Sequence, residues 1–424
     1  MIVSNTAKVV PMPVHQGAAA YDVEQVRADF PILATEVYGK PLVYLDNGAS
    51  AQKPRAVIDA MTTVMETGYS NVHRGVHRLS QVATDSFEAA RKKAAQFINA
   101  RSDKEIIFTR GATEAINLVA ASYGRKFFSK GDEIIVSHME HHSNIVPWQL
   151  LCEEIGAVLK VVPIDDDGNF LFDEFQKVIS KKTKLVAVTH VSNALGTVVL
   201  VKDVIDVAHA HGAVALVDGC QAAPHMAIDV QDLDADFYTF SGHKVYGPTG
   251  VGVLYGKEDL LNTMPPYQGG GDMIASVSFE KITFKKAPHR FEAGTPAIVE
   301  VIGFGAALDY ISEIGLDQIS AHEQSLLEYA TEQLRSMNTI RLIGTAREKA
   351  SIISFVMDGV HAHDVGTIVD RTGIAIRVGH HCAEPVMQRY GVAATARASF
   401  GLYNTHAEVD KLMDALQEVK ELFG

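Results

Sequence analysis

The chain has 424 residues, of which 47% are hydrophobic and 21% are charged. This composition excludes a disordered, collagen-like or coiled-coil protein, and the length predicts more than one domain. The formal net charge of −13 disfavours nucleic acid and anionic membranes as partners, because both carry negative charge.

The only cysteines are Cys152, Cys220 and Cys382, which lie far apart in the sequence. Their odd number and wide spacing disfavour a disulfide framework and a CxxC site. Residues 1–20 lack periodicity and resemble no secretory signal, so we expect a tail without an assigned function. No apolar stretch is long enough to cross a membrane, and we expect a cytoplasmic protein.

Short runs rich in β-branched residues alternate with helical patterns along most of the chain. The predicted strands are Ile106–Thr109, Ile134–Ser137, Leu185–Val191, Val214–Asp218, Phe237–Phe240 and Val251–Tyr255. A helix over Asp203–His211, ended by Gly212, separates two of them. The alternation predicts an α/β fold with a largely parallel sheet, and ligands of such sheets bind at the carboxyl ends of the strands.

The pattern changes after about residue 312. The expected elements there are a helix over Ser325–Met337, a strand over Ile352–Val356, a helix over His363–Thr372 and a final helix. Thr405 and Glu408 form a capping box in front of that last helix. We therefore expect a large domain over residues 21–312 and a smaller α+β domain over residues 313–424.

Lys244 follows a predicted strand within Ser241-Gly-His-Lys244. A lysine held partly out of water can form an imine with an aldehyde, although a solvated loop lysine is the alternative. Asp218 ends another strand at the same edge of the sheet. Pyridoxal phosphate needs this pair, because a buried carboxylate keeps the pyridine nitrogen protonated while lysine holds the aldehyde. A structural ion pair or a helix cap is the other interpretation of Asp218.

A phosphate site is predicted where Arg110-Gly-Ala-Thr113 joins a strand to a helix, because a helix N-terminus offers free N–H groups. Ala112 and Thr113 lie at that point, and Ser241 and His243 could add donors. The glycine pattern starting at Gly250 indicates tight backbone packing instead of dinucleotide binding.

His141 follows the strand that ends at Ser137. An imidazole there could stack on a cofactor ring and move a proton, whereas a hydrogen-bonded core histidine is the alternative. We expect no metal site, because no paired ligand spacing accompanies the neighbouring histidines.

Cys382 lies in a loop with imidazoles and a guanidinium nearby in sequence, which makes it a candidate nucleophile. Cys152 is expected to be a buried, inert thiol on a helix, and Cys220 could fill space beneath the cofactor. Arg397 could bind a substrate carboxylate through two hydrogen bonds, or it could form a salt bridge between domains. Asn193, at a strand end, could bind the cofactor's phenolic oxygen or the substrate carboxylate.

Six motifs together resemble the cysteine desulfurases of the class V aminotransferase superfamily. They are Gly111-Ala-Thr-Glu-Ala-Ile-Asn117, Glu140-His-His, Asp218-Gly-Cys-Gln221, Ser241-Gly-His-Lys244, Arg290-Phe-Glu-Ala-Gly-Thr-Pro296 and Arg377-x-Gly-His-His-Cys-Ala383. The resemblance extends from about Asp22 to the C-terminus, and the last motif resembles the group II, SUF-type branch.

The resemblance implies the type I fold of pyridoxal-phosphate enzymes and a homodimer with active sites at the subunit interface. It implies a covalent cofactor bond for Lys244, with His141 stacked on the cofactor ring. The other implied cofactor contacts are Asp218, Gln221, Thr113, Ala112, Ser241, His243, Asn193 and, from a partner subunit, Thr295. The implied substrate contacts are Arg397, Asn193, Arg377 and His73.

The implied reaction converts L-cysteine to alanine. Lys244 moves the α-proton, Cys382 takes the sulfur as a persulfide, and a SufE- or SufU-type acceptor removes it for iron–sulfur cluster assembly. Selenocysteine lyase activity would use the same residues. An aminotransferase or kynureninase-like lyase would keep Lys244 and Asp218 without needing Cys382, and a non-catalytic scaffold would bind no cofactor.

Overall fold

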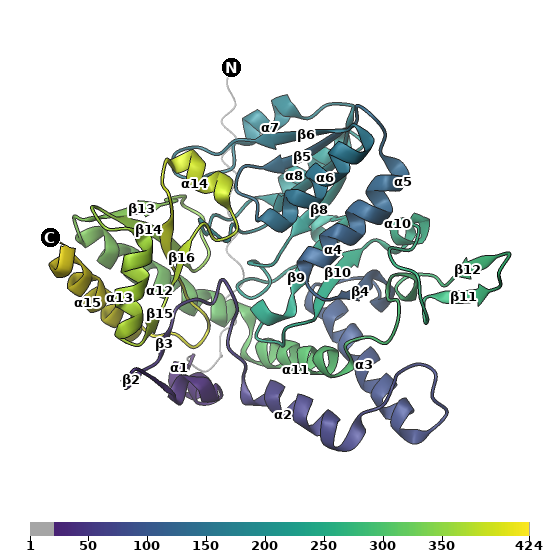
Figure 1. Ribbon diagram of the computed structural model, residues 1–424, viewed down its shortest axis with the longest axis horizontal. Helices are drawn as coiled ribbons and strands as arrows, with labels where there is room; N and C mark the ends of the chain where they lie inside the picture. Colours follow the sequence, from purple (N-terminus) through teal and green to yellow (C-terminus); the bar gives the residue numbers. More distant parts are fainter. Residues whose placement is uncertain (1–20, 424) are drawn as a thin grey trace.

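The computed structural model describes residues 21–423, so the predicted tail lies outside the described residues. A sheet of seven strands forms the centre of the larger part of the molecule (Figure 1). In spatial order the strands are β4 (Ile106–Thr109), β10 (Gly252–Gly256), β9 (Phe237–Ser241), β8 (Val214–Asp218), β7 (Thr183–Thr189), β5 (Glu133–Ser137) and β6 (Val158–Val162). Only β10 runs antiparallel to its neighbours, so the expected α/β fold with a largely parallel sheet is confirmed.

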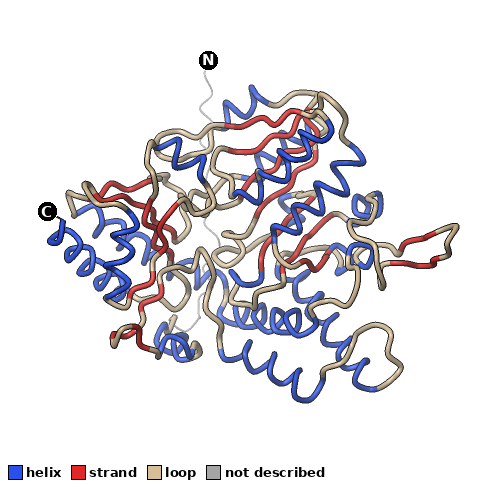
Figure 2. The backbone as a smooth tube through the Cα atoms, in the orientation of Figure 1, coloured by secondary structure: helices blue, strands red, loops and turns tan. Residues whose placement is uncertain are grey.

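Both faces of this sheet are buried. Successive residues of a strand point to opposite faces, so a single strand contributes side chains to two hydrophobic cores. In β5, Ile135 packs into one hydrophobic core, while Ile134 and Val136 pack into another. The first core also contains residues of α3 (Arg78–Phe97), α8 (Val201–Ala210) and α11 (Ile298–Ile314). The second contains residues of α4 (Ala112–Val119) and α6 (Val146–Ile155), so the sheet lies between two layers of helices (Figure 2).

A smaller antiparallel sheet is built from the C-terminal part of the chain. Its strands, in spatial order, are β13 (Ile340–Ile343), β14 (Ile352–Met357), β17 (Thr395–Ser399) and β16 (Arg377–Gly379). A third core joins it to α12 (Leu316–Ser336), α13 (Ala362–Arg371) and α15 (His406–Phe423). The capping box before α15 is present, because Glu408 N donates to Thr405 Oγ1 at 3.3 Å and Thr405 N donates to Glu408 Oε2 at 3.1 Å.

The beginning of the described chain contacts this C-terminal part. Strand β3 (Val43–Tyr44) pairs in parallel with β15 (Ile374–Ala375). Arg27, in α1 (Val23–Ala28), forms a 2.9 Å ion pair with Glu408 of α15. These contacts place the segment after residue 44 beside the smaller sheet, while the domain limits 21–312 and 313–424 stay a prediction.

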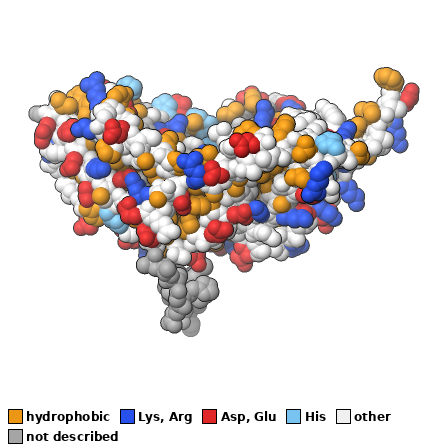
Figure 3. Space-filling model, turned by 90° about the horizontal axis from the view of Figure 1, so that it is seen from below, with side chains coloured by type: hydrophobic (Ala, Val, Ile, Leu, Met, Phe, Trp, Pro, Cys, Tyr) orange, Lys and Arg blue, Asp and Glu red, His pale blue; other side chains and the backbone are white. Residues whose placement is uncertain are grey.

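The remaining regular elements connect these layers. The helices are α2 (Arg55–Thr63), α5 (Arg125–Phe127), α7 (Phe172–Val178), α9 (Val230–Leu233), α10 (Glu258–Thr263) and α14 (Glu384–Tyr390). The strand pairs are β1 (Glu36–Val37) with β2 (Lys40–Pro41), and β11 (Ile274–Val277) with β12 (Ile282–Phe284). The β11–β12 hairpin stands out from the body (Figures 1 and 3), and Phe279 at its turn is exposed.

Several predicted boundaries are wrong. The strand predicted over Leu185–Val191 ends at Thr189, because Val191 turns away to pair with Val198. Residues 374–379 form two short strands instead of one, since Ile374–Ala375 pairs with β3 and Arg377–Gly379 pairs with β17. The helix predicted from Ser325 begins at Leu316. Within residues 21–423, no helix is long and apolar enough to span a membrane.

Candidate active site

A cavity of about 180 Å³ lies at the carboxyl ends of the central strands and extends to the smaller sheet. Its lining brings together most of the residues that the sequence analysis assigned to the site. They are Ala112, Thr113, His141, Asn193, Asp218, Gln221, Ser241, His243, Lys244, Arg377, Cys382 and Arg397. This position agrees with the rule that open α/β sheets bind ligands at this edge.

Asp218 and Lys244 enter the cavity from neighbouring strands. Asp218 is the last residue of β8 and is 3% exposed, and its Oδ1 accepts a 3.0 Å hydrogen bond from Cys220 N. Lys244 ends the 3₁₀ helix η6 (Gly242–Lys244), which follows β9 directly. The two residues therefore lie at one edge because β8 and β9 are paired in parallel.

The turn that carries Lys244 is held by donors from an N-terminal segment. The carbonyl of His243 accepts hydrogen bonds from Ala51 N at 3.0 Å, Ser50 Oγ at 3.3 Å and Lys53 Nζ at 3.2 Å. Burial lowers the pKa of Lys53 to about 8. Burial and the charge of Lys244 lower the pKa of His243 to about 4, so its imidazole is neutral near pH 7.

The N-terminus of α4 forms another side of the cavity. Ala112 N donates a 3.0 Å hydrogen bond to Ser241 Oγ, which links α4 to the end of β9. A side chain on Gly252 would put Cβ 2.5 Å from Gly111 Cα, so the close approach of β10 to this turn requires glycine. This confirms the predicted tight backbone packing in the glycine pattern.

His141 lies on the cavity wall just after β5. Its Nδ1 is 3.1 Å from Ser143 N, which donates to it, and 2.8 Å from Ser143 Oγ. Burial and the positive charge of Lys244 lower the pKa of His141 to about 4. The ring is therefore neutral near pH 7, with Nδ1 as an acceptor and the proton on Nε2.

A buried polar network behind His141 was not predicted from the sequence. The carboxylate of Glu140 is fully buried and accepts hydrogen bonds from Asn144 Nδ2 at 2.7 Å and Thr189 N at 3.0 Å, besides one from Ser137 Oγ. Trp148 Nε1 donates to Asn144 Oδ1 at 2.9 Å. Burial raises the pKa of Glu140 to about 7.

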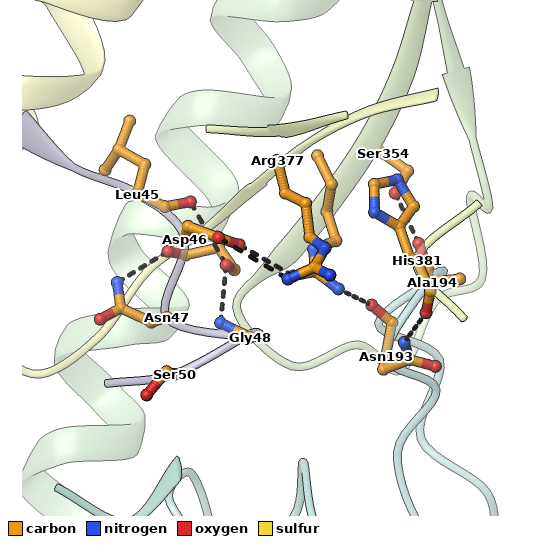
Figure 4. A network of polar contacts seen from close by, with 12 residues as sticks. Leu45, Asp46, Asn47, Gly48, Ser50, Asn193, Ala194, Ser354, Arg377 and His381 are labelled. Atoms are coloured by element: carbon orange, nitrogen blue, oxygen red, sulfur yellow. Dashed lines mark hydrogen bonds and ion pairs between the residues drawn. The ribbon is translucent and has the colours of Figure 1, made fainter. Parts of the chain in front are cut away.

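The two arginines of the cavity share a carboxylate, Asp46, which the sequence analysis missed. Arg397 donates to Asp46 Oδ1 at 3.0 Å and to Asn193 O at 2.9 Å, and Arg377 lies 4.0 Å from Asp46 (Figure 4). Among residues 21–423, Arg397 Nε and Asn193 Oδ1 are buried without hydrogen-bond partners. An unpaired donor and acceptor at a cavity wall are typical of a site that binds a polar ligand.

Cys382 is exposed at the edge of the cavity, between β16 and α14, while its neighbours His381 and Ala383 are buried. His381 and Cys382 have φ angles of +52° and +54°, a left-handed conformation that L-residues rarely adopt. Cys152 is buried in α6, and burial raises its pKa to about 11, which confirms the expected inert thiol. Burial and the charge of Asp218 raise the pKa of Cys220 to about 12, although it also lines the cavity.

Two predicted site residues lie outside this cavity within the described chain. His73 Nε2 is 2.8 Å from Glu88 Oε1, and its ring packs edge-on against Phe87 and His289. Thr295 lines a separate cavity together with Arg110. Their assignments to substrate and to a partner's cofactor stay predictions.

The cavity also contains residues that the sequence analysis did not assign, namely Gly48, Ala49, Ser143, Thr189, Val191 and His381. Gly48 and Ala49 come from the turn after β3. The residues Asp46-Asn-Gly are of the types that favour a turn, so the turn itself was predictable. In the structure, Gly48 N donates to Ser399 Oγ of β17, a residue 351 positions later in the chain. The residues around Gly48 contain no signal of this long-range contact.

The residues present fit pyridoxal phosphate. The cavity offers a lysine for the aldehyde, a buried carboxylate for the pyridine nitrogen, and a helix N-terminus with Ser241 for the phosphate. Gln221 Nε2 donates to Gly48 O at 2.6 Å and lies in the same wall. Arg397 and Asn193, whose Nε and Oδ1 are unpaired among the described residues, line the same cavity.

Comparison with known proteins places this geometry in a family. The profile of aminotransferase class V matches residues 43–412. A cysteine desulfurase of Salmonella agona (strain SL483) is 54% identical over 405 residues, which are 95% of this chain and 100% of the relative. The crystal structure of the cysteine desulfurase CsdA (S-sulfonic acid) from Escherichia coli is 41% identical, with a TM-score of 0.89 over 96% of this chain and 100% of that one.

A C-DES mutant with glycine covalently linked to its PLP cofactor shares the fold, with a TM-score of 0.80 at 23% identity over 94% of this chain and 99% of that one. The predicted type I fold and the pyridoxal-phosphate cofactor are thereby confirmed. The chain belongs to the class V aminotransferase family of pyridoxal-phosphate enzymes and, within it, to the cysteine desulfurases.

Proposed function

We propose that this enzyme acts on L-cysteine, that Cys382 receives the sulfur, and that the enzyme is of the SUF type. The observation that carries the proposal is the position of Cys382, an exposed thiol at the edge of the cavity that also contains Lys244. The two buried cysteines cannot meet a partner from solvent. The cytoplasmic location expected from the sequence is part of the same proposal.

The proposal assigns a role in substrate binding or proton transfer to the polar residues of the cavity. Arg397 and Asn193 bind the substrate carboxylate, because Arg397 Nε is an unpaired buried donor and the guanidinium is fixed by Asp46. Lys244 moves the proton at the substrate α-carbon. Bound pyridoxal phosphate supplies an electron sink for that step, and Asp218 is the carboxylate that holds its ring nitrogen protonated.

Sulfur transfer then uses the thiolate of Cys382. Its sulfur attacks the substrate sulfur, so that an S–S bond forms and the bond between Cβ and sulfur breaks. The electron pair of the broken bond stays on the substrate Cβ, which takes a proton. The α-carbon regains the proton that Lys244 removed, and the product leaves as alanine. His141 is a neutral imidazole on the wall of the same cavity, and its Nε2 proton makes it a donor.

The test compares cofactor-loaded Cys382→Ala with Cys152→Ala, a matched loss of one thiol at a site distant from the cavity. We expect Cys382→Ala to lower alanine and sulfide formation from L-cysteine by at least 100-fold, while Cys152→Ala keeps both. Both products are measured with excess dithiothreitol, which releases the sulfur as sulfide. Unchanged turnover in Cys382→Ala would contradict the role of Cys382, and the same assay with selenocysteine compares the two substrates.

The sulfur acceptor is proposed to be a SufE- or SufU-type protein. Support comes from the Arg377-x-Gly-His-His-Cys-Ala383 motif, which resembles the SUF-type branch, and from the exposure of Cys382. We expect addition of either acceptor to increase alanine formation and to remove persulfide from Cys382, as measured by mass spectrometry. An unchanged rate and a persistent persulfide with both acceptors would contradict this assignment.

The homodimer is proposed on the exposure of apolar side chains around the segment that carries His73. Tyr69, Val76 and Leu79 are 55%, 106% and 47% exposed, and such a cluster is typical of a protein interface. We expect a dimer in light scattering, and a monomer for Val76→Asp at the same concentration. Phe279→Asp, on the separate hairpin, provides the control for added charge on an exposed apolar residue.

A further inference from the structure

Cys382 lies in a backbone conformation that needs external support. Two consecutive residues, His381 and Cys382, are left-handed without being glycine, and such residues persist only where their surroundings hold them. The side chain of Asn193 donates to His381 O at 2.6 Å. Within the segment itself, Ala383 N donates to His380 O at 2.9 Å.

His142 contacts the same segment at two points, one on each side of Ala383. Its backbone N–H donates a 2.7 Å hydrogen bond to Cys382 O. Its ring Nε2 accepts a 3.1 Å hydrogen bond from Glu384 N. Glu384 is the first residue of α14, whose preceding residue, Ala383, has no side chain that could cap it, so the imidazole of His142 performs the capping.

The support for His142 comes from the larger sheet. His142 begins the 3₁₀ helix η5 (His142–Asn144), directly after the cavity residue His141. Asn144, at the other end of that short helix, is fixed by Glu140 and Trp148 in the buried network. The two adjacent histidines therefore divide two tasks, with His141 on the cavity wall and His142 on the segment of Cys382.

We propose that His142 is a positioning residue that fixes Cys382 relative to the site of carbon–sulfur cleavage. Because Glu384 N donates to this ring, Nε2 contributes its lone pair and the ring proton of this tautomer is on Nδ1. This inference rests on the proposed role of Cys382, but the contact itself can be measured without turnover. Loss of the ring leaves the backbone bond to Cys382 O in place, so the segment loosens while the fold persists.

The experiment uses the full-length, cofactor-loaded enzyme and three variants at one position. His142→Ala removes the acceptor, His142→Gln returns an acceptor at the reach of Nε2, and His142→Asn offers one that is too short. His363→Ala, which removes an exposed imidazole from α13, is the control. Amide hydrogen exchange is followed at Glu384 by mass spectrometry with residue-level fragmentation, without substrate, and kcat and KM for L-cysteine are measured separately.

We expect exchange at Glu384 to be about tenfold faster in His142→Ala and His142→Asn than in the wild type, and close to the wild-type rate in His142→Gln and His363→Ala. We expect kcat to fall about three- to tenfold in the first two variants with KM unchanged, because Arg397 and Asn193 are held by Asp46 and by the backbone of His381, and His142 is not among these contacts. Wild-type exchange in His142→Ala, or failure of His142→Gln to restore exchange and kcat, would overturn the proposal. Fast exchange with unaltered kcat would place His142 in the loop structure alone and would equally overturn it.

Discussion

Arg397 shows how a single buried residue is prepared for a ligand. It is 1% exposed, and its guanidinium donates to Asp46 and Asn193, while Nε has no partner in the described part of the chain. Burying an arginine is costly unless its charge is paired, and Asp46 provides that pairing. Because the planar fork is fixed before substrate arrives, little side-chain entropy is lost on binding.

We therefore expect Arg397→Lys to raise KM for L-cysteine at least tenfold with a smaller change in kcat. Lysine keeps the charge but lacks the planar set of donors that matches a carboxylate. Steady-state kinetics of the cofactor-loaded enzyme provide the measurement. Arg341→Lys, on the exposed side of β13, is the control, and an equal KM in both variants would show that Arg397 does not bind substrate.

The residues that carry chemistry could be predicted from the sequence better than the residues that hold them. Lys244, Asp218 and Cys382 each follow a recognisable strand or lie in a distinctive motif. Asp46 could not be assigned, because its function depends on Arg397, 351 positions away. Glu140 belonged to a quoted motif, but only the structure shows that its carboxylate is buried among donors.

Among the elements, long β-branched strands were predictable and β17 was not. The sequence of β17 is Thr-Ala-Arg-Ala-Ser, which has low intrinsic strand propensity. It forms a strand because it lies between β14 and β16, where small residues pack against the third core. The antiparallel direction of β10 could not be predicted either. The direction of a strand depends on how the chain connects it to its neighbours and not on the residues of the strand.

The close contact between β10 and the start of α4 leads to a prediction about cofactor affinity. Alanine at Gly252 would place a methyl group 2.5 Å from Gly111 Cα, so the N-terminus of α4 must move. We expect Gly252→Ala to weaken pyridoxal-phosphate binding about tenfold, which is about 1.4 kcal/mol. Fluorescence titration of the cofactor-free protein measures this affinity.

Gly269→Ala is the matched control for that titration, because in residues 21–423 no atom beyond the adjacent residues lies within 4 Å of the added methyl group. We expect its affinity for the cofactor to equal that of the wild type. Equal affinity of Gly252→Ala would mean that the helix N-terminus does not contribute to the phosphate site.

At the scale of the whole molecule, the site depends on two sheets meeting. The pattern of predicted helices and strands changes near residue 312. The sequence could not show that β3 pairs with β15, since each of these strands has only two residues. This pairing brings the turn with Asp46 beside β17, and Asp46 itself bridges to Ser399. The cavity thus combines the strand ends of the larger sheet with arginines of the smaller sheet.

Burial of neutral histidines makes the stability of the whole molecule depend on pH. His190 lies in the core against Tyr238, with Nδ1 3.0 Å from the phenol oxygen, and burial lowers its pKa to about 4. The unfolded chain binds a proton at His190 below about pH 6.5, whereas the folded chain does not until about pH 4. The stability from the neutral ring is therefore present above pH 6.5 and is lost as the pH falls toward 4.

We expect the wild type to lose about 1 kcal/mol more unfolding free energy than His190→Asn between about pH 7 and pH 5.5, because asparagine has no proton to gain. Urea unfolding of the cofactor-loaded proteins at both pH values gives this difference, and other titrating groups cancel in the comparison. Glu140 has the opposite sign, since burial raises its pKa to about 7, so the total slope is shallower than the contribution of His190. A wild-type slope in His190→Asn would contradict the prediction, because it would show that the folded and unfolded chains gain the His190 proton over the same pH range.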